Sequence, residues 1–143
     1  MPSEQPTRED WGASAPLNQL FFLVYFYAIS RRDLSPEQQA IQAAHAQLEY
    51  VRRFGAAFDE HPTFIFLTAK DTNQLAVTYF ILNLSGIKVH HFSDPDYDWG
   101  QLTAIAAVLS EEDRHLLSDL PLWKVTPKPG RLNWLKALFT RKH

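Results

Sequence analysis

Cysteine is absent from the 143-residue chain, and methionine occurs only once. The lack of cysteine excludes disulfides, thiolate nucleophiles, Cys-ligated zinc and iron–sulfur clusters. Glycine is scarce, with five residues, and none of them are spaced as a phosphate-binding loop requires. The longest apolar run, residues 20–29, is ten residues long, whereas a membrane-spanning helix needs about 20. Acidic residues precede that run where a signal peptide would be basic, so we expect a cytoplasmic protein.

The composition is that of an ordinary globular domain, with 45% hydrophobic and 21% charged residues. The net charge of −2 hides an asymmetry, because six basic residues and no acidic one follow from position 124 onward. We expect a leader over residues 1–19, one domain over residues 20–120, and a linker with a basic tail over residues 121–143.

The pattern along the chain predicts alternating strands and helices. Apolar or β-branched runs at 20–29, 63–69, 87–92 and 102–109 indicate four strands. Ser35 followed by Pro36 and Gln38 indicates the start of a helix that continues to about Phe54, and a second helix spans 73–84. Ser110 begins a short acidic helix. Helical crossovers favour parallel pairs, so the expected fold is α/β, with a mixed four-stranded sheet and helices on both faces.

The first helix contains two candidate faces. At 100° per residue, one face is apolar and is expected to dock on the sheet; it comprises Ala40, Ile41, Ala44, Leu48 and Val51. The neighbouring stripe is polar and comprises Gln38, Gln42, His45, Glu49 and Arg52. That stripe is either an ordinary solvated flank or a ledge that faces a ligand near the helix N-terminus. Arg31 and Arg32, just before the helix, either bind a phosphodiester or form ion pairs with neighbouring acidic side chains.

A family resemblance lies in this region. Arg32-Asp33-Leu34, followed by Gln38-Gln39-Ala40-Ile41-Gln42-Ala43-Ala44-His45-Ala46, resembles the signature of type 2 peptidyl-tRNA hydrolases. In that family a buried first strand ends in Arg-x-Asp-Leu, and a short loop leads into a helix with Gln-x-x-His-Ala. The resemblance covers roughly residues 20–110. It implies hydrolysis of the ester between a peptide and the terminal ribose of tRNA, on a mixed four-stranded sheet flanked by helices.

The resemblance also implies roles for individual residues. Gln42 and His45 match the helix Gln and His, and Thr103 resembles the Thr near the start of the last strand. A loop aspartate of the family corresponds to one of Asp94, Asp96 and Asp98, which we expect to orient or deprotonate water. The family lysine is replaced by Gln38, which offers hydrogen bonds without charge. Arg31, Arg32 or Arg52 would then supply the positive charge for substrate phosphates, so the chain is a divergent member.

Two further groups of residues have open interpretations. His90 and His91 lie near the loop aspartates, but successive strand residues point to opposite faces, so we expect neither a metal nor a cofactor. Tyr97 and Trp99 either stack on a base or pack over the core.

The basic tail contains a broad apolar face over residues 131–142, which predicts a final amphipathic helix. It packs on the domain or on a second copy, or else it binds nucleic acid; a membrane surface is the less favoured partner. Two functional alternatives to the hydrolase therefore stay open. One is a catalytically inactive fold relative that binds RNA or protein, and the other is a protein whose tail directs homodimers, other homo-oligomers or association with a membrane.

Overall fold

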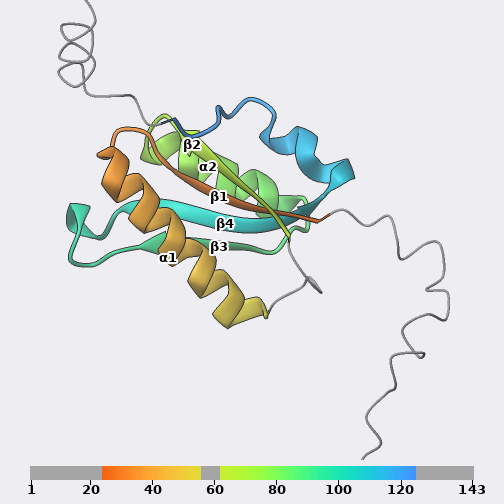
Figure 1. Ribbon diagram of the computed structural model, residues 1–143, viewed down its shortest axis with the longest axis horizontal. Coiled ribbons are helices and arrows are strands. Elements are labelled where there is room, and N and C mark those ends of the chain that lie inside the picture. Colours follow the sequence, from red (N-terminus) through yellow and green to blue (C-terminus); the bar gives the residue numbers. More distant parts are fainter. Residues whose placement is uncertain (1–23, 56–61, 125–143) are drawn as a thin grey trace, which may run out of the picture.

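The computed structural model describes residues 24–55 and 62–124, and its centre is a four-stranded mixed sheet (Figure 1). The strands are β1 (Val24–Arg31), β2 (Thr63–Ala69), β3 (Val89–Ser93) and β4 (Leu102–Ser110), in the spatial order β2-β1-β4-β3. β1 pairs with β2 in parallel and with β4 antiparallel, and β3 pairs with β4 antiparallel. The predicted α/β class and mixed four-stranded sheet are confirmed.

One helix covers each face of the sheet (Figure 1). Helix α1 (Pro36–Phe54) connects β1 to β2, and helix α2 (Thr72–Leu84) connects β2 to β3. The Ser35 side chain accepts a hydrogen bond from the Gln38 amide at the start of α1, and Asp71 does the same for Gln74 at the start of α2. Gly55 ends α1 with φ 77°, a conformation that residues with a side chain rarely adopt.

Two hydrophobic clusters lie on opposite faces of the sheet. On the α2 face, Leu75 and Leu82 pack against Tyr27 and Ile29 of β1 and against residues of β4. On the α1 face, Ala46 and Tyr50 pack against Phe26, Ala104 and Ala106. The second cluster is rich in alanine, so α1 lies close to β4.

The face that α1 turns to the sheet differs from the prediction. The buried residues of α1 are Gln39, Gln42, Ala43, Ala46 and Tyr50, whereas Ile41, Ala44 and Leu48 are exposed. The prediction of an Ala40–Ile41–Ala44–Leu48–Val51 docking face is therefore wrong for Ile41, Ala44 and Leu48, whereas Ala40 is half-buried and Val51 packs against the cluster on the sheet. Small side chains at positions 43, 46, 104 and 106 allow close packing of helix and sheet, and the glutamines fill the remaining space with satisfied hydrogen bonds.

Residues 121–123, which the sequence pattern assigned to a linker, pair with the outer edge of β2. The Thr68 amide donates to the Pro121 carbonyl at 2.9 Å, and the Trp123 amide donates to the Phe66 carbonyl at 2.8 Å. The Trp123 ring stacks on Phe66 with a centroid distance of 4.9 Å. The preceding 3-10 helix η2 (Glu111–Leu117) takes the place of the expected short acidic helix. The predicted leader over 1–19 and the helix over 131–142 lie outside the described residues.

No helix in the described ranges has both the length and the apolar character needed to cross a bilayer.

Candidate functional site

Several of the residues singled out by sequence lie where the parallel strands end. β1 and β2 finish at this edge, α1 and α2 begin there, and β4 starts there after the 3-10 turn η1 (Asp98–Gly100) (Figure 1). We call this region the carboxyl edge. Ligands of open α/β sheets commonly bind at such an edge, beside the point where the connections diverge to opposite faces.

Gln42 and Thr103 are in direct contact although 61 positions separate them in sequence. The Thr103 hydroxyl lies 2.6 Å from Gln42 Oε1 and 3.2 Å from the Phe92 carbonyl, and its single proton serves one acceptor at a time. Gln42 Nε2 donates to Gln38 Oε1 at 3.3 Å. Gln42 is 1% exposed and Thr103 is 0% exposed, so the pair forms a buried polar link between α1 and β4.

A β-bulge directs Thr103 toward α1. Phe92 pairs with Ala104, whereas Ser93 pairs with Leu102, so Thr103 is left as the extra residue of β4. Strict alternation would have placed Thr103 on the α2 face with Ile105, because Ala104 and Ala106 face α1. Bulges re-aim side chains in this way and are frequent next to functional sites.

His45 lies one turn further along α1. Its ring stacks on Phe92 of β3, with centroids 5.0 Å apart and planes 7° from parallel, and the residue remains exposed. The three positions that the family resemblance selects, Gln42, His45 and Thr103, therefore occupy one corner between α1 and the β3–β4 pair.

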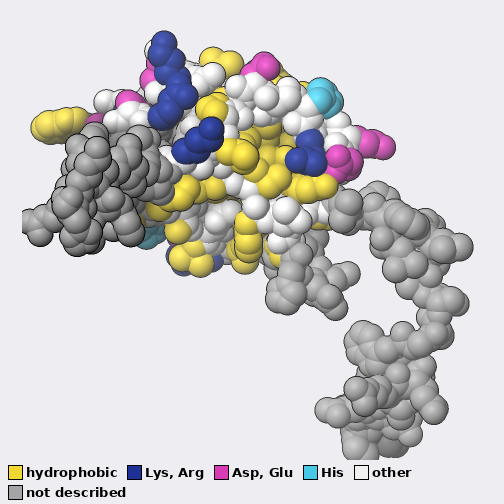
Figure 2. All heavy atoms as spheres, turned by 45° about the horizontal axis from the view of Figure 1, so that its top comes forward, with side chains coloured by type: hydrophobic (Ala, Val, Ile, Leu, Met, Phe, Trp, Pro, Cys, Tyr) yellow, Lys and Arg dark blue, Asp and Glu magenta, His cyan; other side chains and the backbone are white. Residues whose placement is uncertain are grey.

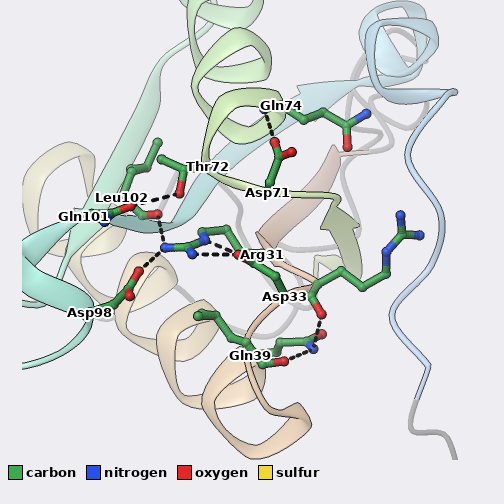
Figure 3. Close-up of polar contacts among 11 residues, drawn as sticks. Arg31, Asp33, Gln39, Asp71, Thr72, Gln74, Asp98, Gln101 and Leu102 are labelled. Atoms are coloured by element: carbon green, nitrogen blue, oxygen red, sulfur yellow. Dashed lines mark hydrogen bonds and ion pairs between the residues drawn. The ribbon is translucent and has the colours of Figure 1, made fainter.

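Arg31 is a buried cation held by two carboxylates (Figure 3). Its Nε and Nη2 donate to Asp33 at 3.0 and 2.7 Å, and its Nη1 donates to Asp98 and, at 3.4 Å, to the Leu102 carbonyl. The hydrogen bonds to Asp33 raise the pKa of Arg31, although burial opposes them, and the same bonds lower the pKa of Asp33. Arg31 is thus committed to internal ion pairs and does not serve as a free phosphate ligand.

The three loop aspartates have different surroundings. Asp98 is half-buried and fixed by Arg31. Asp94 accepts a hydrogen bond from the Asp96 amide at 3.0 Å, which shapes the turn, and the Asp96 side chain is exposed. Within the described ranges, Asp98 is the one of the three candidates that binds another side chain at the carboxyl edge.

The loop at the carboxyl edge has an unusual backbone. Asp98 and Trp99 have φ angles of 50° and 58°, a conformation that is rare outside glycine and asparagine. Trp99 is 96% exposed, so the reading of this side chain as core packing is wrong. Such backbone strain persists only where the surrounding contacts hold it, and the Arg31–Asp98 ion pair is one such contact.

A hollow of about 440 Å³ adjoins this site on the β2 side. Arg32 and Lys124 contribute its charged groups, and its remaining lining is apolar or neutral: Leu34, Pro36, Gln39, Thr68, Pro121 and Leu122. Gln39 is held rigidly, since its Nε2 donates to the Leu34 carbonyl at 2.7 Å. Within the described part of the chain neither Arg32 nor Lys124 has an ion-pair partner, so the hollow has the charge expected of an anion site.

Arg52 lies outside this region. It pairs with Glu49 at 2.9 Å and stands ten residues beyond Gln42, about 15 Å further along α1. The predicted substrate-binding residues are therefore divided: Arg32 and Gln38 lie at the carboxyl edge, Arg31 is buried in ion pairs, and Arg52 is remote.

His90 and His91 pair with residues of β4 that belong to opposite faces of the sheet, but their rings stack on each other, with centroids 5.8 Å apart and planes 5° from parallel. The His91 ring meets Tyr79 of α2 edge-on at 5.3 Å, whereas His90 interacts with Glu49 and Arg53 of α1. Across residues 24–55 and 62–124, no three His, Asp or Glu side chains are grouped as metal ligands would be.

A larger hollow, of about 750 Å³, runs along the outer edge of β2 and η2, away from the predicted residues. Figure 2 shows hydrophobic side chains gathered in the middle of this face, with basic, acidic and histidine side chains around them. Phe64 and Leu122 contribute its exposed apolar surface, and Arg114 borders it. Arg114 is itself engaged, because its Nε donates to the Tyr27 hydroxyl at 3.0 Å.

Sequence reasoning missed three contributors to the carboxyl edge: the pairing of Arg31 with Asp98, buried Gln39, and Lys124 in the hollow. Two adjacent glutamines at a helix start were the only available signal for Gln39.

Comparison with known proteins shows the fold alone. No family model matches the chain, and no curated protein does. Among solved structures, the chain is similar to the protein of unknown function Atu0240 from Agrobacterium tumefaciens strain C58, with a TM-score of 0.59 and 11% identity. The similarity covers 73% of this chain and 100% of that one.

Proposed function

We propose that the chain is a type 2 peptidyl-tRNA hydrolase-like protein that binds the ester-bearing end of an acylated tRNA at the carboxyl edge and cleaves the ester with activated water. The observation that carries the proposal is the Thr103–Gln42 hydrogen bond. The resemblance selected these residues from distant parts of the sequence, and a β-bulge at Thr103 is needed to bring them together.

Among the loop carboxylates, we assign to Asp98 the role of orienting or deprotonating the attacking water. One of its oxygens is paired with Arg31, which fixes the group beside the start of β4, and the other has no protein donor among the described residues. A positioned carboxylate that accepts a proton from water contributes about 10²- to 10⁴-fold to a hydrolysis rate. We assign the orientation of the ester to His45 and Gln38, which lie on the same side of α1 as Gln42.

The hollow that contains Arg32 and Lys124 is the proposed phosphate site. Arg32 and Lys124, which have no ion-pair partner among residues 24–55 and 62–124, lie beside the N-terminus of α1 and favour a phosphodiester. Exposed Trp99, on the neighbouring loop, offers a ring on which a base can stack, which is worth about 1–3 kcal/mol per base.

A second candidate function is RNA binding without catalysis. It is favoured by the burial of Gln42 and Thr103, whose polar groups bond to each other, and by neutral Gln38 where the family has a lysine. In this case the carboxyl edge is retained for recognition only.

Turnover and binding of the same labelled peptidyl-tRNA separate the two candidates. The hydrolase predicts release of peptide, lowered about 100-fold in Asp98→Asn and unchanged in Asp96→Asn, a matched variant in the same loop. Circular dichroism and thermal unfolding establish that both variants are folded. Binding without turnover supports the second candidate, and the absence of both overturns the two together.

The proposed phosphate site is tested separately, with a control variant at a residue outside the hollow: Arg32 lines the hollow and Arg52 does not. Arg32→Ala weakens filter binding and lowers the slope of log K against log salt by about 1, whereas Arg52→Ala, at the remote part of α1, leaves both unchanged. Equal effects of the two variants would contradict the assignment of the hollow.

A further inference from the structure

A further hollow lies at the edge of the sheet opposite the carboxyl edge, between the C-terminal parts of α1 and α2. β3 begins at this edge, because β1 and β3 both run antiparallel to β4 and therefore share one direction. The volume of the hollow is about 290 Å³, close to the lower limit for ligand sites. Its walls come from three segments: Arg53 and Phe54 of α1, Tyr79 and Asn83 of α2, and residues 86–89. We call it the amino-edge hollow.

Two cations from distant parts of the sequence converge on the amino-edge hollow. The Arg53 guanidinium carbon lies 5.4 Å from the centre of the Phe54 ring, and the Lys88 ammonium lies 5.9 Å from the same centre. Neither cation has an ion-pair partner among residues 24–55 and 62–124. The described residues that line the hollow include no Asp or Glu. The two positive charges therefore repel each other at a place where no described carboxylate offsets them.

The helix dipole does not account for this convergence. A basic residue in the last turn of a helix is favoured by the negative end of the dipole, and α1 has two of them, Arg52 and Arg53. Arg52 is paired with Glu49, whereas Arg53 lines the hollow. Lys88 lies beyond the end of α2, and its ammonium group reaches the ring of Phe54 on the other helix. The two cations are thus brought together from separate segments by the tertiary fold.

The wall from α2 adds a neutral hydrogen-bond donor. The Tyr79 hydroxyl accepts a hydrogen bond from Asn83 Nδ2 at 3.4 Å, and its own proton has no acceptor among the described residues. Gly86 has a φ angle of 77°, and no atom lies within 4 Å of a methyl group added there, so this side of the hollow is open. A small anion in the hollow would meet two cations and a hydroxyl donor.

We propose that the amino-edge hollow binds a phosphate group, either as the free ion or on a small organic molecule. A phosphate dianion has two charges to match the two cations, and its oxygens accept several hydrogen bonds at once, whereas a carboxylate has one charge and two oxygens. The hollow is distinct from the one that contains Arg32 and Lys124. On α1, the distance from Gln38 at the carboxyl edge to Arg53 is about 22 Å, so the site is independent of the proposed hydrolase.

Titration of the full chain with inorganic phosphate, followed by NMR at constant ionic strength, tests the site. We expect the amide signals of Gly86 and Lys88 to shift to saturation, with a dissociation constant of about millimolar order. Arg53→Ala and Lys88→Ala should each raise this constant about fivefold, the upper end for an exposed charge pair. The matched control is Arg52→Ala, which removes the neighbouring arginine outside the hollow and should leave the constant unchanged. Circular dichroism establishes that the variants are folded.

Four outcomes overturn the proposal. They are the absence of saturable shifts up to about 50 mM phosphate, equally tight binding of acetate, and an equal loss of binding in Arg52→Ala. The fourth is phosphate binding that appears only after Asp59→Asn and Glu60→Gln, because carboxylates that follow α1 in the sequence then occupy the hollow.

The source of the phosphate group is identified by a parallel titration with adenosine 5′-monophosphate and with adenosine. Tighter binding of inorganic phosphate indicates the free ion, and tighter binding of the monophosphate indicates a phosphate on a larger molecule. Both results support the site. Adenosine that binds as tightly as its monophosphate would show that the phosphate is not what the hollow recognises, and would overturn the proposal.

Discussion

Replacement of Thr103 by valine is the sharpest test of the carboxyl edge. Valine keeps nearly the same shape but removes the hydroxyl that lies 2.6 Å from Gln42 Oε1. Gln42 is 1% exposed, so its carbonyl oxygen loses this donor at a place where water does not replace it. An unsatisfied buried acceptor costs about 1–3 kcal/mol. For a domain of this size, a loss of 2 kcal/mol lowers the melting temperature by roughly 10 °C.

A double-mutant cycle with Gln42→Met tests whether the destabilisation in Thr103→Val comes from the lost contact with Gln42. If the two side chains stabilise the fold through each other, the double variant is less destabilised than the sum of the single variants, by about 1–2 kcal/mol. Urea unfolding at equilibrium measures each free energy of unfolding. A destabilisation below about 0.5 kcal/mol in Thr103→Val, together with no coupling to position 42, would refute the buried link between α1 and β4.

Three further outcomes are expected. Arg31→Lys destabilises the protein by about 2 kcal/mol because an ammonium cannot reproduce the forked bonds to Asp33, and urea unfolding showing no loss would contradict that geometry. Burial, aided by His91 and Arg53, lowers the pKa of His90. The unfolded chain therefore binds more protons, so stability falls as pH drops below about 6.5. Thermal unfolding of His90→Phe between pH 5 and 7.5 should show a weaker dependence, and an unchanged dependence rules His90 out. Gly55→Ala lowers the free energy of unfolding by about 1–2 kcal/mol, because residues with a side chain rarely adopt a φ of 77°. No atom of the protein crowds the added methyl group, so the loss comes from the backbone alone.

Local signals predicted the elements of the fold well. Ser35, Pro36 and Gly55 bound α1 as expected, because capping and backbone freedom act over a few residues. The run Thr63–Ala69 forms β2 with the predicted ends. The turn after β3 leads into β4, an antiparallel partner that lies inside the sheet, so that β3 forms the edge of the sheet.

The orientation of α1 was predicted wrongly because a hydrophobic pattern ignores side-chain volume. The large apolar residues Ile41 and Leu48 face solvent, whereas Ala43 and Ala46 face the sheet. The small residues occupy the sheet-facing positions because they permit close contact with the alanines of β4. A buried glutamine is tolerated there where its hydrogen bonds are made. Neither condition is visible until the helix and β4, far apart in sequence, are brought together.

By itself, the sequence determined the α/β class, the helix boundaries and the selection of Gln42, His45 and Thr103, because these depend on caps, periodicity and a short motif. Tertiary structure alone decided where those residues lie and what they contact. The bulge that turns Thr103 toward Gln42 is a mismatch of register between β3 and β4. Asp98 is distinguished from Asp94 and Asp96 by an ion pair across 67 positions. Such choices depend on contacts between distant segments, and a local pattern does not contain them.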